Sequence, residues 1–374
     1  MQEDKFIPIY EPLLGGNESK YLNECIDTGW ISSKGRFVTE FESKFQSFIG
    51  SSYALSASNG TVALHLALEA LGIKAGDEII VPDLTFAASI NAILYCGATP
   101  VLADIERETF NIDFSKVEQL ITSKTKAIMP VHLYGLACDM DLCMSIAKKH
   151  NLLVVEDSAE AFGSEFEGRK LGSFGDVATF SFYGNKTITT GEGGMITFND
   201  QKVYQKAKVL RDHGMDPQKT YWHNFVGYNY RMTNMQAAIG LAQIERIDEI
   251  LKQKVSIANY YRSKLQNVPG ISFVSESSKK LNTYWLVTIL IDPKKFGLNR
   301  NLLQQRLKEN NIDSRPVFFS LHIMPPYKKY YKTDLNNSKY VSDNGISLPS
   351  SLNLSHTDID RICDTILSIH NNNN

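Results

Sequence analysis

Three groups of residues in this chain have the types and positions needed to hold an aromatic cofactor that carries a phosphate. Lys186 follows an apolar, strand-like run and stands just before a glycine-rich turn. Asp157 ends a second apolar run, and Asn59-Gly60-Thr61 opens a helix-like segment. Desolvation at the end of a buried strand favours the neutral, nucleophilic amine that forms Schiff bases. An amine, a carboxylate and a phosphate-binding helix start together predict pyridoxal phosphate.

Each group has a simpler explanation when it is taken alone. A lysine after a strand is most often a solvated surface group, and the tripeptide at the helix start is typical of an N-cap. Asp157 could be a structural cap or could ligate Mg²⁺ together with Glu156 and Glu160. A metal is disfavoured because no histidine cluster or second carboxylate motif with ligand spacing accompanies these residues. We therefore expect no metal site.

Two further residues are placed to contact the same cofactor. Ser181 ends the strand before the lysine and offers a hydroxyl to the phosphate, and Phe86 follows another strand and could stack on the ring. A core aromatic is the simpler reading of Phe86. Residues 191–194 (GEGG) lack both the GxGxxG spacing and a GK[ST] ending, so they predict a tight turn between strands. A dehydrogenase is disfavoured because no glycine fingerprint follows the first strand.

Short apolar runs alternate with amphipathic segments between residues 53 and 200. Several runs are almost continuously apolar, which is typical of a sheet covered by helices on both faces. This alternation predicts an α/β fold with a mostly parallel mixed sheet. The predicted strands are Tyr53–Ala57, Glu78–Pro82, Pro100–Ile105, Ala127–Leu133, Leu152–Asp157, Val177–Tyr183 and Gly194–Phe198.

The pattern changes in the C-terminal part of the chain. Met235–Leu265 has the apolar spacing of one long helix, and a strand (Trp285–Ile291) and two helices (Arg300–Asn310 and Thr357–Ile369) follow. We expect a large cofactor-binding domain at residues 1–250. A smaller C-terminal α/β domain is expected at residues 251–374.

Bulk properties exclude several classes of partner. The formal net charge is -2, which offers no electrostatic footprint for nucleic acid or an anionic membrane. Five cysteines without a CxxC pair are typical of a reducing cytoplasm. The N-terminus lacks the basic start and apolar run of a signal peptide, and no apolar run reaches the length of a membrane span. We therefore expect a cytoplasmic protein.

Four sequence blocks, in this order, carry a specific resemblance: residues 59–68 (NGTVALHLAL), 76–82 (GDEIIVP), 156–161 (EDSAEA) and 181–186 (SFYGNK). Together they resemble the DegT/DnrJ/EryC1/StrS family of sugar aminotransferases, which are fold-type I pyridoxal-phosphate enzymes. The resemblance runs from Pro8 nearly to the C-terminus. Ser158 stands where the family usually has alanine, and Tyr183 where phenylalanine is common.

The resemblance implies a role for each candidate residue. It implies Lys186 as the Schiff-base lysine, since relatives with histidine there dehydrate instead, and Asp157 on the pyridine nitrogen. It also implies an Asn229 that reaches the phosphate from a neighbouring subunit, and hence a homodimer or a larger assembly. The remaining cofactor contacts that it implies are Gly60, Thr61 and Ser181 on the phosphate, Phe86 on the ring and Glu160 near the cofactor hydroxyl.

Further blocks resemble the branch of this family that acts on a GDP-linked sugar: residues 30–37, 130–135, 227–234, 314–318 and 322–327. This resemblance implies L-glutamate as the amino donor and the C4 ketone of GDP-4-keto-6-deoxymannose as the acceptor, for a surface polysaccharide such as O-antigen. Arg231, Arg315 and His322 are the candidate substrate residues, although each arginine could equally form a structural ion pair. A UDP- or dTDP-linked 4-keto-6-deoxy sugar, a 3-keto sugar, and a non-catalytic regulator remain as alternatives.

Overall fold

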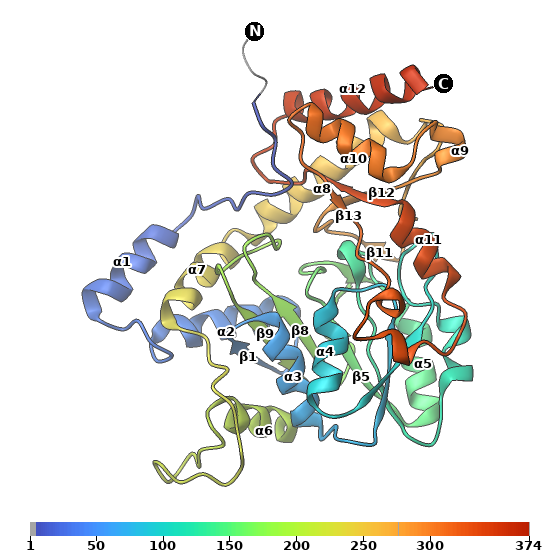
Figure 1. Cartoon of the computed structure of the whole chain (residues 1–374). Coiled ribbons are helices and arrows are strands. Elements are labelled where there is room, and N and C mark those ends of the chain that lie inside the picture. The colour runs from blue at the N-terminus through green and yellow to red at the C-terminus, as the bar shows by residue number, and fades with distance from the viewer. Residues whose placement is uncertain (1–4, 276, 374) are drawn as a thin grey trace.

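A seven-stranded mixed sheet forms the centre of the large part of the molecule (Figure 1). The computed structural model describes residues 5–275 and 277–373. Residues 1–4, which belong to the N-terminus expected to lack a signal peptide, lie outside the described residues. Among the seven strands only β9 runs antiparallel to its neighbours, which confirms the mostly parallel α/β fold. The strands, in spatial order, are β1 (Tyr53–Ala57), β9 (Gly194–Phe198), β8 (Val177–Ser181), β5 (Leu153–Asp157), β4 (Thr125–Ile128), β2 (Glu78–Pro82) and β3 (Thr99–Ala103).

Helices cover both faces of this sheet, as the apolar strands predict. Successive side chains of a strand point to opposite faces. In β2, Ile79 and Val81 therefore join the core under one set of helices, whereas Ile80 joins the core on the other side. The first set is α3 (Gly60–Leu71), α4 (Ala87–Tyr95) and α6 (Gln201–Arg211), and the second includes α2 (Arg36–Ile49) and α5 (Met140–His150).

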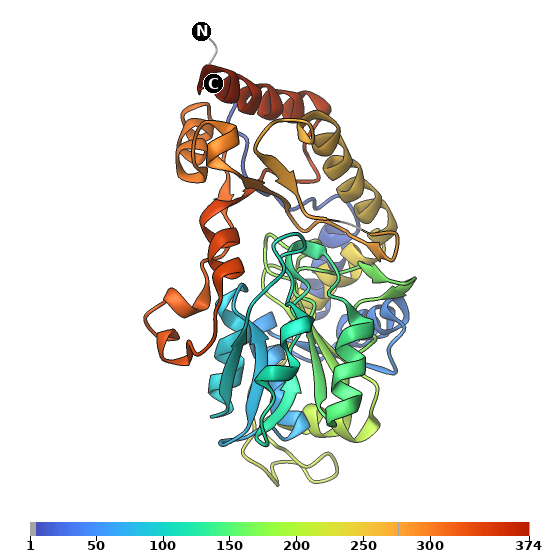
Figure 2. The same ribbon diagram turned by 90° about the vertical axis from the view of Figure 1, so that its right-hand side faces the viewer.

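A second, smaller sheet lies above the large one and is antiparallel (Figure 2). Its core also contains Ile7 of the N-terminal segment, which pairs with Ile312. The predicted division near residue 250 would fall inside α8, the helix that runs between the two parts (Figure 1). The elements of this part are β10 (Ile271–Phe273), β12 (Val287–Ile291), β14 (Gly345–Leu348) and β13 (Arg315–Pro316), with α10 (Arg300–Glu309) and α12 (His356–Asn373).

The prediction of one long helix over Met235–Leu265 is wrong. The segment forms two helices, α7 (Asn234–Ile244) and α8 (Ile247–Leu265), which are separated at Glu245 and Arg246. Arg246 has φ -110° and ψ 15°, outside the helical range. The break allows α7 to pack on the large part while α8 continues to the smaller sheet.

Three predicted strands end earlier than expected: β3 ends at Ala103 rather than Ile105, β8 ends at Ser181 rather than Tyr183, and β4 is shortened most. Strand β4 stops at Ile128 rather than continuing to Leu133, and Pro130, which has no N–H to donate to a ladder, follows two residues later. Within the described residues, no helix combines the length and apolarity needed to cross a membrane.

Candidate active site

Lys186 lies in a turn after β8, with its amine enclosed between an acidic and an aromatic side chain. Its Nζ is 3.5 Å from Glu160 Oε1 and 3.8 Å from the centroid of the Trp285 ring. Burial lowers the pKa of Lys186, whereas the charges of Glu160 and Asp157 act in the opposite direction. A lowered amine pKa is what a nucleophilic lysine needs.

Asp157 is buried at the C-terminal end of β5. Its Oδ2 accepts a hydrogen bond from Ser89 Oγ at 2.7 Å, and its Oδ1 accepts one from Ala159 N at 3.2 Å. Burial raises the pKa of Asp157, and these hydrogen bonds and the Lys186 charge partly offset that effect. The carboxylate is therefore held rigidly at the edge of the sheet where α/β proteins bind their ligands.

Glu160 lies between the lysine and the loop after β4. Its Oε2 accepts a hydrogen bond from Tyr134 N at 2.9 Å, while its Oε1 faces Lys186. Burial raises the pKa of Glu160 to about 7. The carboxyl group can therefore take up and release a proton near neutral pH.

The start of α3 and the end of β8 meet in a corner that has no room for larger residues. A Cβ atom on Gly60 would lie 2.8 Å from Ser181 Cβ, and one on Gly194 would lie 2.5 Å from Asn59 O. Asn59 accepts a hydrogen bond from Val62 N at 3.0 Å, which makes it the N-cap of α3. The first N–H groups of a helix point outward and attract anions.

Thr61 belongs to the first turn of α3, half-buried beside this corner. Its hydroxyl and the Ser181 hydroxyl are on the two elements that the corner brings together. A phosphate bound there would meet hydroxyl donors and helix N–H groups. The tripeptide at residues 59–61 thus serves as a helix start, and its geometry also suits an anion.

Phe86 precedes α4 and is 58% exposed, so it is not a core aromatic. It lines a cavity of about 500 Å³ together with Asn185, Trp285 and Arg315. Its ring centroid lies 5.6 Å from that of Phe318, another lining residue. An exposed aromatic ring beside the lysine turn is available to cover a planar cofactor or a sugar.

The candidate substrate residues lie in three different places. Arg315 lines the cavity and contacts Asp313 at 3.2 Å, with its side chain 62% exposed. Arg231 instead lies 2.8 Å from Asp212 and donates to Asn229 Oδ1 at 3.0 Å. Within the described part of this chain, no hydrogen bond or ion pair joins Asn229 or Arg231 to Lys186.

His322 is bonded to the large sheet rather than aimed into the cavity. Its Nδ1 lies 2.7 Å from Asp83 Oδ2, and its backbone N–H donates to Asp83 Oδ1 at 2.8 Å. Its ring also stacks on Tyr331, with 5.0 Å between centroids. These contacts tie the segment that carries His322 to the end of β2, where Asp83 lies just beyond the strand.

Four residues of the site were missed by sequence reasoning. Trp285, Tyr134 and Tyr10 surround the lysine turn, and Ser89 supports Asp157. Trp285 and Tyr10 are far from the lysine in sequence, and no local pattern marks them. Ser89 lies on α4, three residues after Phe86, so the only signal was its position in the first turn of a helix that follows a strand.

Glu156, one of the carboxylates considered as a possible metal ligand, has a structural role. Glu156 accepts hydrogen bonds from the N–H groups of Gly172, Phe174 and Gly175 and lies 3.2 Å from His132 Nε2. Its oxygens are thus occupied by protein donors. This explains the acidic pair at the end of β5 without a metal, because only Asp157 faces the lysine.

Elsewhere, His65, Glu69 and Cys96 form a polar cluster whose potential ligand atoms lie within 4.8 Å of one another. Its members already interact with each other: His65 Nε2 is 3.6 Å from Glu69 Oε1, and burial together with the nearby Glu69 raises the pKa of Cys96. His65 Nδ1 bonds Tyr230 OH at 3.1 Å. The cluster therefore serves to pack α3 against the end of α4 and the segment before α7.

The residues present fit pyridoxal phosphate. The amine and two carboxyl groups face one another, and the small-residue corner at Gly60 lets the start of α3 approach the hydroxyl-bearing Ser181 closely. Two buried polar atoms beside these groups, Ser158 Oγ and Asn185 Oδ1, have no hydrogen-bond partner among the described residues. Unpaired buried polar atoms are costly, so they are typical of a site that binds a polar ligand.

The fold and the site define a class: an α/β protein built to bind a phosphorylated aromatic cofactor through a lysine. The family described as the DegT/DnrJ/EryC1/StrS aminotransferase family matches residues 12–367. The chain belongs to this family.

Two relatives are similar to the chain over nearly its whole length. A GDP-perosamine synthase of Caulobacter vibrioides is 49% identical over 362 residues, which cover 95% of this chain and 96% of that protein. A GDP-perosamine synthase of Escherichia coli O157:H7 is 48% identical over 363 residues, with 97% and 98% covered. Spr1654 of Streptococcus pneumoniae, solved in its PLP form, superposes with a TM-score of 0.93 at 29% identity, with 98% and 99% covered. The fold that the resemblance implied is confirmed.

Proposed function

We propose that this protein is a pyridoxal-phosphate-dependent aminotransferase that moves the amino group of L-glutamate to the C4 ketone of GDP-4-keto-6-deoxymannose, giving GDP-perosamine. The observation that carries the catalytic part is the amine of Lys186, 3.5 Å from Glu160 and within the electrostatic field of Asp157. The acceptor follows from the near-full-length similarity to two GDP-perosamine synthases. We place the reaction in the cytoplasm, where the five buried cysteines would stay unpaired.

Pyridoxal phosphate, when bound, supplies the electron sink that accepts charge from the carbon losing its proton. Lys186 would hold the cofactor carbonyl carbon, and its freed amine would act as the general base and acid. It takes a proton from the α-carbon of glutamate in one half of the reaction and returns one to C4 of the sugar in the other. Amino groups balance, because glutamate leaves as a 2-oxo acid and the ketone becomes an amine.

Asp157 would keep the cofactor ring nitrogen protonated. A carboxylate there must remain charged, and the hydrogen bonds from Ser89 and Ala159 favour the charged form despite burial. Glu160 would accept or donate a proton at the cofactor hydroxyl, because its raised pKa of about 7 allows both states. Gly60, Thr61 and Ser181 would hold the phosphate.

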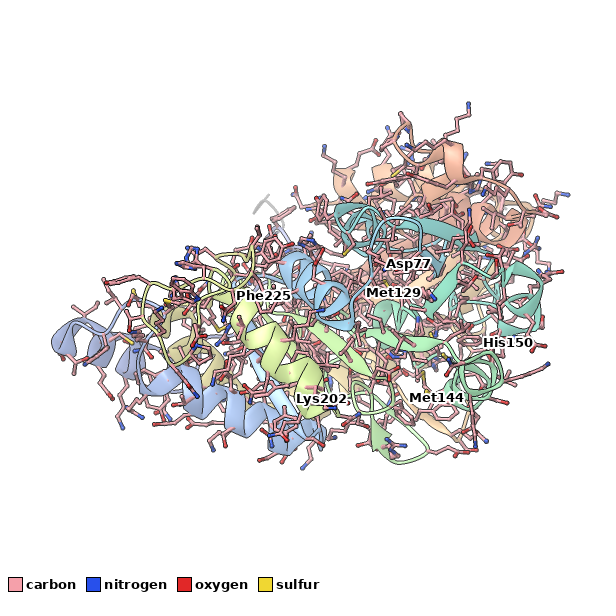
Figure 3. The ribbon with its side chains drawn as sticks, turned by 90° about the horizontal axis from the view of Figure 1, so that it is seen from below. Asp77, Met129, Met144, His150, Lys202 and Phe225 are labelled. Atoms are coloured by element: carbon pink, nitrogen blue, oxygen red, sulfur yellow. The ribbon has the colours of Figure 1, made fainter. Side chains whose placement is uncertain are left out.

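We propose that the active unit is a homodimer in which Asn229 reaches the phosphate of the neighbouring subunit. Asn229 is exposed and is bonded to Arg231 rather than to any residue of the lysine site. The preceding loop also exposes large apolar side chains, including Tyr221 and Val226, which are 86% and 93% exposed. Figure 3 labels Phe225 in this loop. Exposed apolar residues gathered in one loop are typical of an interface.

Arg315 is the residue best placed to contact the nucleotide-sugar in the same chain. Its exposed guanidinium borders the cavity, and guanidinium groups bind pyrophosphate through paired hydrogen bonds. Arg231 would act from the neighbouring subunit together with Asn229. His322 would contribute by fixing the segment between Ser320 and Met324, since its ring is bonded to Asp83.

The test is to incubate the protein with pyridoxal phosphate, L-glutamate and GDP-4-keto-6-deoxymannose and to analyse nucleotide-sugars by mass spectrometry. A new GDP-amino-dideoxyhexose is expected, and NMR then gives the configuration at C4. If glutamate converts the cofactor to its amine form but no amino sugar forms, the acceptor is wrong and UDP- and dTDP-linked ketosugars should be tried. If glutamate does not react with the bound cofactor at all, the aminotransferase proposal fails.

A further inference from the structure

The backbone of the lysine turn is held by two aromatic side chains that come from outside the large sheet. Trp285 Nε1 donates to Asn185 O at 2.6 Å, and Tyr10 OH donates to Lys186 O at 2.8 Å. Two consecutive carbonyl groups are thus bound from two different segments. Trp285 also covers the Lys186 amine with its ring face, 3.8 Å from the centroid.

Both aromatic residues contact one buried lysine on the far side. Lys254, in the middle of α8, is only 1% exposed. Its Nζ donates to Trp285 O and to Ser350 O, each at 2.8 Å, and lies 5.2 Å from the centroid of the Tyr10 ring. In the described part of the chain, the amine contacts carbonyl oxygens and no carboxylate.

Ser350 links the N-terminal segment to the same lysine, because its carbonyl accepts from Lys254 while its N–H bonds that segment. Ser350 N donates to Ile9 O at 2.9 Å, directly before Tyr10, and Ser350 Oγ accepts from Val287 N at 2.9 Å. Lys254 therefore joins the three segments that carry Tyr10, Trp285 and Ser350. Removing it would leave two buried carbonyl groups without their donor, which costs more than the hydrogen bonds themselves contribute.

We propose that Lys254 is a positioning residue for the active site: it fixes Trp285 and Tyr10, which in turn fix the turn and the amine of Lys186. This inference rests on the proposed function, because the residue that Lys254 positions is Lys186, the lysine proposed to carry the cofactor. Small displacements of a reacting group are sufficient to slow catalysis about a hundredfold. An amine on a turn held by two aromatic donors stays within such limits.

Burial supports the same assignment. It lowers the pKa of Lys254 to about 7, so this amine binds carbonyl groups at neutral pH without needing a charged partner. The Trp285 ring, 5% exposed, keeps water from one side of Lys186 and thereby contributes to the lowered pKa of the catalytic amine. Loosening Trp285 should admit water and move that pKa back towards its ordinary value.

The experiment compares Lys254→Met and Trp285→Phe with the exposed control Lys252→Met on the same helix. The first removes both amine hydrogen bonds, and the second keeps an aromatic ring but removes the indole N–H. The rate at which pyridoxal phosphate attaches to the cofactor-free protein is measured against pH, since only the neutral amine reacts. For folded Lys254→Met, we expect the midpoint to rise by about one pH unit, which is a tenfold change in the proton affinity of Lys186.

The half-reaction with glutamate gives a second readout. Lys254→Met should lower kcat about 10- to 100-fold with KM changed by less than about threefold, because positioning acts on the chemical step. Trp285→Phe should shift both readouts in the same direction, whereas Lys252→Met should match the wild type.

Unchanged pH midpoints and kcat in folded Lys254→Met overturn the proposal. If Lys254→Met does not fold, Trp285→Phe decides: wild-type values there mean that the network is purely structural and the proposal is wrong. If wild-type protein attaches the cofactor but does not react with glutamate, the proposed function fails while the pH midpoints still test the positioning.

Discussion

Ser89 donates a hydrogen bond to Asp157 Oδ2 at 2.7 Å and so connects the first turn of α4 to the end of β5. Thr85 Oγ1 lies 2.9 Å from the same serine hydroxyl, which extends the connection to the segment after β2. A buried carboxylate with a raised pKa is kept charged by such donors. The orientation of the Asp157 carboxylate, which is proposed to face the cofactor ring, thus depends on the Ser89 hydroxyl.

The relationship predicts graded losses of activity. Asp157→Asn removes the charge, and turnover should fall by about three or more powers of ten because the stabilisation of the reacting carbon is lost. Ser89→Ala removes one hydrogen bond to a charged group, worth about 1.5–3 kcal/mol, so turnover should fall only about 10- to 100-fold. Steady-state kinetics check both variants, with circular dichroism to show that they fold. Near-normal turnover in Asp157→Asn would mean that another group protonates the ring.

Lys186→Ala should abolish transamination while leaving the fold intact. The side chain is proposed both to hold the cofactor and to move the proton, so turnover should fall by at least about a thousandfold. Mass spectrometry of the product and the visible absorbance of the bound cofactor provide the measurements. Lys202→Ala, at an exposed position on α6 (Figure 3), is the matched control and should keep full activity. Retained turnover in Lys186→Ala would contradict the assignment of Lys186 as the Schiff-base lysine.

Glu160 should make stability depend on pH. Its pKa is raised from 4.5 to about 7 by burial, so the folded protein binds more protons than the unfolded chain between these values. The free energy of unfolding of the cofactor-free protein should therefore decrease as pH rises from about 4.5 to 7. Glu160→Gln removes this dependence and should be more stable than the wild type above pH 7, by about 3 kcal/mol. Urea unfolding at pH 5 and pH 8 measures the difference, and equal stability differences at both pH values would contradict it.

Glu156 should matter for stability rather than for catalysis. Glu156→Ala leaves three N–H groups and the buried His132 without their acceptor, and should destabilise the protein by about 3–5 kcal/mol. Denaturant unfolding monitors the change. Glu249→Ala, whose side chain is 62% exposed, is the control and should change stability by less than about 1 kcal/mol. A similar small effect for Glu156→Ala would show that the loop at residues 172–175 does not need this carboxylate.

A shared active site should allow two inactive variants to complement each other. In a mixed dimer of Lys186→Ala and Asn229→Ala subunits, one of the two sites would keep both residues if Asn229 acts across the interface. Mixing should therefore restore up to about a quarter of wild-type activity, because half of randomly paired dimers are mixed and each has one intact site. Activity that remains at the level of the separate variants would place Asn229 outside the neighbouring site.

Local patterns were sufficient for the elements that carry the main chemical groups. Continuous apolar runs predicted the strands because both faces of a parallel sheet are covered, and strands β1, β2 and β9 have the predicted bounds. The ends of β5 and β8 then placed Asp157 and Ser181 at one edge of the sheet, since parallel strands end on the same side. The family resemblance supplied the roles of these residues.

Patterns were less informative where a helix had to be interrupted. The apolar spacing of residues 235–265 continues through the break at Arg246, so the sequence by itself predicts one helix. The interruption reflects packing of α7 and α8 on different parts of the molecule, which no local propensity records. The same reasoning applies to Ile7, which packs in the core of the C-terminal sheet although it lies in the N-terminal segment.

The sequence therefore determined the α/β fold and the lysine and carboxylate of the site, because strand periodicity and strand ends are local properties of the chain. Only the tertiary structure decided what surrounds them. Trp285, Tyr10 and Lys254 lie about 70 to 180 positions from Lys186 in the chain. Tyr10 and Trp285 hold the lysine turn through hydrogen bonds to the backbone carbonyl groups of Lys186 and Asn185, and Lys254 holds the carbonyl group of Trp285. Every residue offers such a carbonyl, so the sequence carries no mark of which one is bound.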